Sequence, residues 1–193
     1  MSPARARTSI DEIVAAGREL LEAGGLDAVT MQAVAERVGV RAPSLYKRVP
    51  SRAALIAAIG GAVTDDLRRA IEPLAHGADP AADLRVVAAA FRAFAHESPR
   101  SYELLFMSLP TDARPPVEMS ALAAAPVLDL AARLVGPDRA LEAARLITAF
   151  ANGFISMELS GAFRLGGNAD DAYAYGVDVL VNALAERRSR TPG

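Results

Sequence analysis

The stretch from Val40 to Leu55, VRAPSLYKRVPSRAAL, gathers side chains that could bind an anionic partner. It contains four cationic residues and no acid, and no acidic residue occurs anywhere between Glu36 and Asp65. Guanidinium and ammonium groups pair with phosphate oxygens and with the guanine O6 and N7 acceptors, and a tyrosine hydroxyl can donate to phosphate. These residue types, placed so close together, predict a site for an anion.

Charge is unevenly distributed along a chain that is slightly acidic overall. The 193 residues carry a formal net charge of −2, but residues 1–60 are net +2 and residues 61–193 are net −4. We therefore expect the anionic partner to bind the first part of the chain. Cysteine is absent, which excludes disulfides, thiolate zinc sites and a cysteine nucleophile and fits a reducing compartment.

Capping signals divide the first part of the chain into short helices. Ser9 with Glu12 forms a capping box before the first pattern, and Thr30 is placed as the N-cap of the second. Glycine and proline mark the stops. The predicted helices cover residues 10–23, 31–38, 42–49 and 52–74.

Two short helices joined by a tight turn at residues 39–41 describe a helix-turn-helix motif, whose second helix enters the DNA major groove. Residues 26–59, LDAVTMQAVAERVGVRAPSLYKRVPSRAALIAAI, resemble the DNA-binding half of the tetracycline-repressor (TetR) family of bacterial transcription regulators. The resemblance lies in the order and spacing of Thr30, the turn from Ala35 to Val40, Leu45-Tyr46 and Pro50-Ser51-Arg52.

The resemblance implies DNA contacts that the chemistry of each residue supports. Tyr46 and Arg52 are expected to hold phosphates, and Thr30 is a further candidate for a backbone contact. Arg5 and Arg7 are candidates for an arm on the backbone or in the minor groove. Base reading is expected from the start and the exposed face of the third helix, at Arg41, Pro43, Ser44 and Lys47.

The chain departs from the common family pattern at Lys47-Arg48-Val49, where many members have an aromatic residue and a histidine before phenylalanine. This difference leaves two roles open for Lys47 and Arg48, because either can read a base or touch only phosphate. Taken singly, a cation such as Arg37 or Arg48 is more often part of a solvated face than of a binding site. The ordered set on a helix-turn-helix pattern favours DNA.

The second part of the chain shows only helical patterns, over residues 80–97, 100–108, 117–135, 138–165 and 170–187. We expect Pro126 to kink or divide its helix. Bulky apolar side chains recur at helical spacing and are more often plain core. In a TetR-like protein they would instead surround a pocket for a small effector; the candidates are Phe91, Phe94, Tyr102, Phe106, Met107, Phe150, Phe154 and Met157.

The segment 147–167, ITAFANGFISMELSGAFRLGG, is similar to a C-terminal domain of one TetR subgroup, in which a tryptophan and a His-Gly pair precede a Leu-Glu-rich helix. Phe150 and Asn152-Gly153 stand at those positions here. In the family, the last two long helices pair with those of a second copy. The resemblance therefore implies a homodimer formed through residues 138–165 and 170–187.

No catalytic or metal-binding pattern is found in the second part. His76 and His96 both lie near predicted helix ends, where a histidine is commonly solvated. The adjacent pairs Asp65-Asp66 and Asp170-Asp171 diverge on a helix rather than converge on one ion. We expect no metal and no cofactor, and no enzymatic activity.

Membrane insertion and export are also disfavoured by the sequence. No window reaches the roughly 18 uninterrupted apolar residues of a spanning helix, although 52% of the residues are apolar. The N-terminus has no apolar stretch like that of a signal peptide. We expect a cytoplasmic protein.

These observations predict an all-α protein with a three-helix helix-turn-helix domain at residues 1–52 and a larger effector-binding and dimerisation domain at residues 53–193. The predicted function is that of a sequence-specific transcription regulator, most often a repressor, which a small apolar or amphipathic effector releases from a palindromic operator in double-stranded DNA. The alternative is a helical small-molecule-binding protein or enzyme that has a basic face but does not bind DNA.

Overall fold

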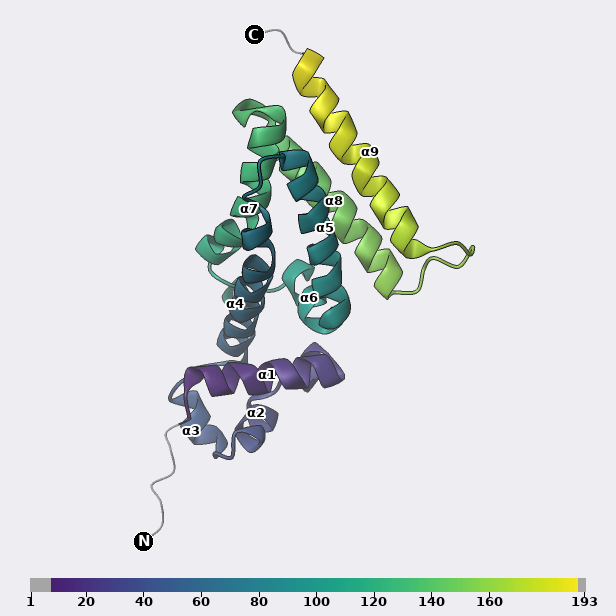
Figure 1. Ribbon diagram of the computed structural model, residues 1–193. Coiled ribbons are helices and arrows are strands. Elements are labelled where there is room, and N and C mark those ends of the chain that lie inside the picture. Colours follow the sequence, from purple (N-terminus) through teal and green to yellow (C-terminus); the bar gives the residue numbers. More distant parts are fainter. Residues whose placement is uncertain (1–7, 191–193) are drawn as a thin grey trace. The chain divides into compact units, whose positions relative to one another are not determined.

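The computed structural model describes residues 8–190, and the side chains of residues 8–186. The described residues form α-helices with short 3-10 turns and no β-strand, which confirms the predicted all-α class (Figure 1). The helices are α1 (Ile10–Gly24), α2 (Met31–Arg37), α3 (Ala42–Tyr46), α4 (Arg52–Ile71), α5 (Pro80–Glu97), α6 (Pro99–Phe106), α7 (Val117–Val135), α8 (Ala140–Leu159) and α9 (Ala169–Arg190).

The helices belong to two compact units. The first contains the chain up to Thr64 together with Arg100–Met119, and the second contains Asp65–Pro99 and the chain from Ser120 onward. The first part of α4 and the first turn of α6 both contact α1 in the first unit. The predicted boundary between DNA-binding and effector-binding functions stays a prediction.

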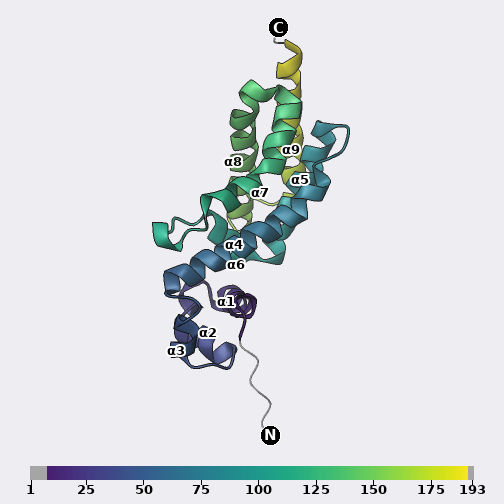
Figure 2. The ribbon, with the colours of Figure 1, turned by 90° about the vertical axis from the view of Figure 1, so that its left-hand side faces the viewer.

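Local signals set the first unit's short helices, which lie together in Figure 2. The Ser9 hydroxyl accepts from the Glu12 N–H at 3.1 Å, and the Glu12 carboxylate accepts from the Ser9 N–H at 2.8 Å. Thr30 caps α2 by accepting from the Ala33 N–H at 3.1 Å. Gly39 then takes a φ of +71°, which permits the tight turn into α3.

Close helix packing and a shared carboxylate link α1 to the rest of the first unit. Gly17 has no side chain, so the Ile59 side chain of α4 lies directly against the α1 backbone; a Cβ there would lie 2.6 Å from Ile59 Cδ1. The Glu22 carboxylate accepts from the backbone N–H groups of Arg100 at 3.2 Å and Ser101 at 2.7 Å. A side chain of α1 therefore caps the first turn of α6.

The second unit is built around α5, α8 and α9, which lie side by side (Figure 1). Tyr173 and Val177 of α9 are buried, and the Tyr173 hydroxyl donates to the Ala88 carbonyl of α5 at 3.0 Å. The Phe150 ring of α8 lies where a Cβ on Gly176 would be, 2.2 Å from Phe150 Cζ. This glycine allows α8 and α9 to approach closely.

Several helix boundaries differ from the prediction. The third helix, predicted over 42–49, ends at Tyr46. The helix predicted over 52–74 ends at Ile71 and continues as a 3-10 turn. The helix predicted to run to residue 165 ends at Leu159, because Gly161 adopts a φ of +68° and stops α8. Pro126 was predicted to kink or divide its helix; α7 continues through it, so the helix is not divided, and the kink stays a prediction.

Candidate nucleic-acid interface

The short helix α3 has one buried side and one exposed side. Leu45 and, just beyond the helix, Val49 are 1% and 2% exposed and anchor this segment in the core of the first unit. Tyr46 is 50% exposed, and Lys47 and Arg48 are exposed as well. The aromatic and cationic side chains therefore point to solvent because the apolar ones take the core positions.

Three cations around α3 have no intramolecular partner. Among the residues whose side chains are described, the side chains of Arg41, Lys47 and Arg48 make no hydrogen bond or ion pair. All other arginines of this part of the chain except Arg145 on α8 have such a partner. Arg37, for comparison, is held by Glu19 at 2.6 Å. Unpaired positive charge is thus concentrated at α3 and at the turn before it, which favours an external anion as partner.

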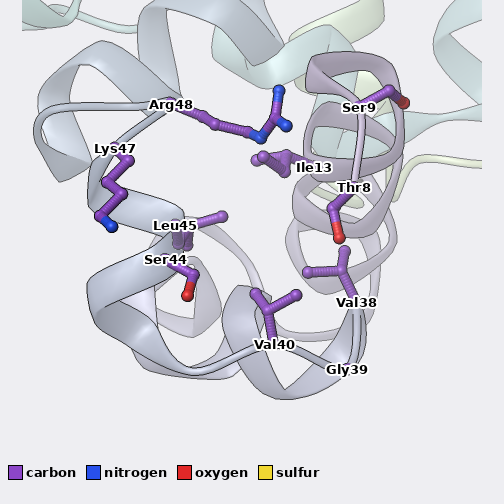
Figure 3. Close-up of a pocket in the computed structure, with 10 residues that line it drawn as sticks. All are labelled: Thr8, Ser9, Ile13, Val38, Gly39, Val40, Ser44, Leu45, Lys47 and Arg48. Carbon is purple, nitrogen blue, oxygen red and sulfur yellow. The ribbon is translucent and has the colours of Figure 1, made fainter. Parts of the chain in front are cut away.

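A hollow of about 1010 Å³ lies between the first turn of α1 and α3 (Figure 3). Arg48 extends across it from the α3 side towards Ile13, whereas Lys47 points away from α1. Its lining combines apolar side chains with hydroxyl and cationic groups, and such donors suit an anion. The lining residues are Thr8, Ser9, Ile13, Val38, Gly39, Val40, Ser44, Leu45, Lys47 and Arg48.

Two predicted phosphate contacts have structural tasks in this unit. The Thr30 hydroxyl caps α2, and its own proton is still available for donation to an external acceptor. The Arg52 guanidinium donates to the carbonyls of Val29 at 2.7 Å and Leu26 at 2.6 Å, so it ties the start of α4 to the turn before α2. A phosphate contact by Arg52 stays a prediction.

The predicted base-reading residues lie at the start of α3 and just beyond its end. Arg41 precedes the helix at the N-cap position, and its side chain makes no capping hydrogen bond. Pro43 and Ser44 are exposed in the first turn, where proline is tolerated because it needs no N–H partner. The structure thus brings Arg41, Pro43, Ser44 and Lys47 to one short helical segment. Arg5 and Arg7 lie outside the described residues.

The candidate effector residues are divided between the two units. Tyr102 is buried and its ring contacts that of Phe106 at 5.2 Å, and Met107 is exposed; these three belong to the first unit. The other five belong to the second unit: Phe91 and Phe94 on α5, and Phe150, Phe154 and Met157 on α8.

In the second unit, some of these aromatic residues meet. The Phe150 and Phe154 rings both contact Tyr173, with centroids 5.9 and 5.2 Å apart respectively. Phe163 contacts Phe154 at 4.7 Å. We call Phe150, Phe154, Phe163 and Tyr173 the aromatic cluster.

An ionic network beside the aromatic cluster was not predicted from the sequence. Arg92 of α5 donates to both carboxylate oxygens of Glu158 and to Asp170, and His96 lies 3.1 Å from Glu158. Hydrogen bonds from Arg92 lower the pKa of the Glu158 carboxyl despite its partial burial. Burial raises the pKa of the Tyr173 hydroxyl. Residues so far apart in the sequence give no local signal. The His96 side chain is partly exposed and also contacts the Glu158 carboxylate.

The described residues offer neither a metal site nor a membrane-spanning helix. No group of three or more His, Cys, Asp or Glu side chains in this part of the chain could hold a metal ion. Within the same residues, no helix combines the length and apolarity needed to cross a bilayer.

Comparison with known proteins agrees with the helix-turn-helix geometry. Residues 13–59 match the model of bacterial regulatory proteins of the tetR family, and residues 84–180 match the model of the tetracyclin repressor-like C-terminal domain. Together they identify a DNA-binding class of regulator. The chain belongs to the TetR family of bacterial transcription regulators.

Individual relatives are similar along nearly the whole chain. An uncharacterized HTH-type transcriptional regulator of Mycobacterium tuberculosis, Rv0681, is 29% identical over 189 residues, which are 96% of this chain and 84% of the relative. A Rhodococcus sp. RHA1 protein of unknown function has a TM-score of 0.79 at 20% identity, over 96% of this chain and 100% of that one. A TetR variant of Acinetobacter baumannii in complex with minocycline has a TM-score of 0.70 at 22% identity, over 94% and 98%. These two structures share the fold.

Proposed function

We propose that the protein is a sequence-specific DNA-binding repressor that acts in the cytoplasm and uses α3 as its recognition helix. The observation that carries this proposal is the set of unpaired, exposed cations Arg41, Lys47 and Arg48 around a helix whose apolar side is buried. A helix in the major groove presents such side chains to base edges and to the flanking phosphates. The proposal assigns no enzymatic step to the protein.

The orientation of the side chains supports a division of roles within this surface. Arg41 and Lys47 are proposed to reach guanine acceptors, and Pro43 to contact a thymine methyl. Arg48 extends over the hollow next to α1, away from the direction of Lys47, and is proposed to hold a phosphate. Because Arg52 is bound to two carbonyls, we expect Arg48 to supply more of the phosphate affinity than Arg52.

Pairing of two copies through α8 and α9 is proposed to align two recognition helices. The outward faces of these helices carry large exposed apolar side chains: Leu141, Leu146, Tyr175 and Val179. Such side chains lose contact with water when a second copy covers them. Two identical chains related by a two-fold axis read a palindrome whose half-sites lie about one DNA turn apart.

Release from DNA is proposed to follow binding of an apolar or amphipathic effector to the larger helical domain. The A. baumannii TetR variant forms a complex with minocycline, so a chain of this fold accommodates a small molecule. An effector shifts the protein towards the conformation that it binds better, and it weakens DNA binding if that conformation mismatches the operator. The chemical class is inferred from the aromatic side chains of α5, α6 and α8.

Selection from a pool of random-sequence duplexes tests this function without knowledge of the operator. The full chain is incubated with the pool, and the bound duplexes are amplified and sequenced through several rounds. We expect a palindrome with half-sites about 10 base pairs apart and a complex of two chains per duplex. A pool that stays random after selection contradicts the proposed function.

A further inference from the structure

Arg92 joins three helices of the second unit through one guanidinium group. Its Nε donates to Glu158 Oε2 at 2.8 Å, and its Nη2 donates to Glu158 Oε1 and, at 2.6 Å, to Asp170 Oδ1. The Arg92 and Glu158 side chains are only 17% and 13% exposed. The guanidinium carbon also lies 5.4 Å from the centre of the Tyr173 ring. We call Arg92, Glu158 and Asp170 the clasp.

The two acids of the clasp lie at the two ends of one connecting segment. Glu158 is the residue before the last of α8, and Asp170 is the second residue of α9. The segment 160–168, which connects the two helices, therefore has both of its ends held by the same side chain. A partly buried ion pair pays a desolvation cost that offsets much of its attraction, so it does more to specify one arrangement than to stabilise the fold.

The connector is otherwise weakly held. Residues 160–168 are all exposed, and Gly161, Gly166 and Gly167 adopt φ values of +68°, +82° and +88°. Leu165 is completely exposed. Exposed segments with few buried contacts have low local stability. Its hydrogen bonds are local: the N–H groups of Gly161 and Ala162 donate to carbonyls at the end of α8, and Asn168 accepts from the Asp170 N–H at the start of α9. Removing the clasp would leave these short-range bonds and the contact of Phe163 to keep the segment in place.

One side chain of the connector covers part of the aromatic cluster. Phe163 lies on Phe154 with the ring centres 4.7 Å apart, and Phe154 in turn meets Tyr173 edge-on at 5.2 Å. Movement of the connector away from α8 would uncover the Phe154 ring and its neighbours. Flat apolar molecules bind to such exposed aromatic faces.

We propose that the connector 160–168 is a strap that the clasp keeps closed over the aromatic cluster, and that its opening admits flat aromatic ligands to Phe154 and Tyr173. The proposal rests on the proposed function only in identifying such a ligand with the effector. Arg92 is a positioning residue in this device, because it holds the two ends of the strap and does not itself contact Phe163.

The chain offers a matched control on the same helix. Arg85 lies seven residues before Arg92 on α5 and pairs with Asp178 and Asn182 in the middle of α9, away from the connector. Arg85→Ala removes the same charge and a similar link between α5 and α9, but it leaves both ends of the strap held. A difference between Arg92→Ala and Arg85→Ala therefore reports on the strap.

Limited trypsin digestion of the full chain measures opening directly, because Arg164 lies within the strap. We expect cleavage after Arg164 to be about tenfold faster in Arg92→Ala than in Arg85→Ala or the wild type, since loss of a charge-assisted hydrogen bond raises the open population by about that factor. Asp170→Asn, at a 72% exposed position, should have an intermediate rate and provides a variant that folds if Arg92→Ala does not.

Ligand access is measured with 1-anilinonaphthalene-8-sulfonate, a flat aromatic probe. We expect the probe to bind Arg92→Ala and Asp170→Asn more tightly than Arg85→Ala. Equal cleavage rates in Arg92→Ala and Arg85→Ala would overturn the proposal that the clasp holds the strap closed. Faster cleavage of Arg92→Ala without tighter probe binding would overturn the proposal that the strap covers the aromatic cluster. Neither measurement uses DNA, so a failure here is distinct from a failure of the proposed repressor function.

Discussion

Replacing Arg52 with alanine removes the two hydrogen bonds that join the start of α4 to the turn before α2. A hydrogen bond from a charged donor contributes about 1.5–3 kcal/mol when buried, and an exposed charged contact about 0–1 kcal/mol. The bond to the Val29 carbonyl is partly buried and the bond to Leu26 is exposed. We therefore expect Arg52→Ala to lower the free energy of unfolding by about 2 kcal/mol.

Urea-induced unfolding followed by far-ultraviolet circular dichroism measures this loss. With a denaturant slope of about 2 kcal/mol per molar, the midpoint should fall by about 1 M. Arg52→Lys keeps the charge but lacks the planar fork that reaches two carbonyls, so it should lose most of the same stability while it keeps the salt dependence of DNA binding. An unchanged midpoint in both variants would refute the assigned structural role.

Three further predictions concern contacts elsewhere in the two units. Glu22→Ala leaves the first N–H groups of α6 uncapped and should reduce stability by about 1 kcal/mol, measured as a lower urea midpoint. Gly176→Ala places a Cβ against the Phe150 ring, and its overpacking cost of about 1–3 kcal/mol should exceed the helical gain of about 1 kcal/mol, so the melting temperature should fall rather than rise. Arg92 lowers the pKa of the Glu158 carboxyl in the folded state. Ionised Glu158 therefore stabilises the fold at pH values above the pKa that it has in the unfolded chain, and this stabilisation is lost as the pH falls through its lower pKa in the folded state. Melting temperatures between pH 7 and 2 should consequently fall less steeply below about pH 4 in Glu158→Gln than in the wild type.

The starts of the helices in the first unit could be predicted from the sequence, because a capping residue acts on N–H groups only three or four residues away. Ser9 and Thr30 begin α1 and α2 as predicted. The same local reasoning failed at the end of α8, where the spacing of Leu159 and Phe163 predicted that the helix continues past Gly161 to residue 165. The left-handed conformation of this glycine ends the helix, and the pattern of side chains beyond it belongs to the connector.

Contacts between distant residues were beyond sequence reasoning. The sequence indicated that Arg52 is cationic and near a helix start, but its carbonyl partners lie 23 and 26 residues upstream. The Arg92 clasp spans 66 and 78 residues. Which arginine is bound within the protein depends on such tertiary contacts, and for this reason the structure was needed to distinguish Arg52 from Arg48.

The most direct test of the central claim is the affinity of Arg41→Ala/Lys47→Ala/Arg48→Ala for the duplex that the wild type selects and for a scrambled duplex of equal length. Fluorescence anisotropy is recorded from about 50 to 200 mM salt, the range over which phosphate contacts strongly weaken. We expect the triple variant to lose about a hundredfold or more in affinity for both duplexes and to show a shallower salt dependence. Arg69→Ala, which removes an exposed positive charge from α4, should bind as the wild type does. A triple variant that binds both duplexes with the affinity and salt dependence of the wild type would contradict the assignment of α3 as the DNA-binding surface.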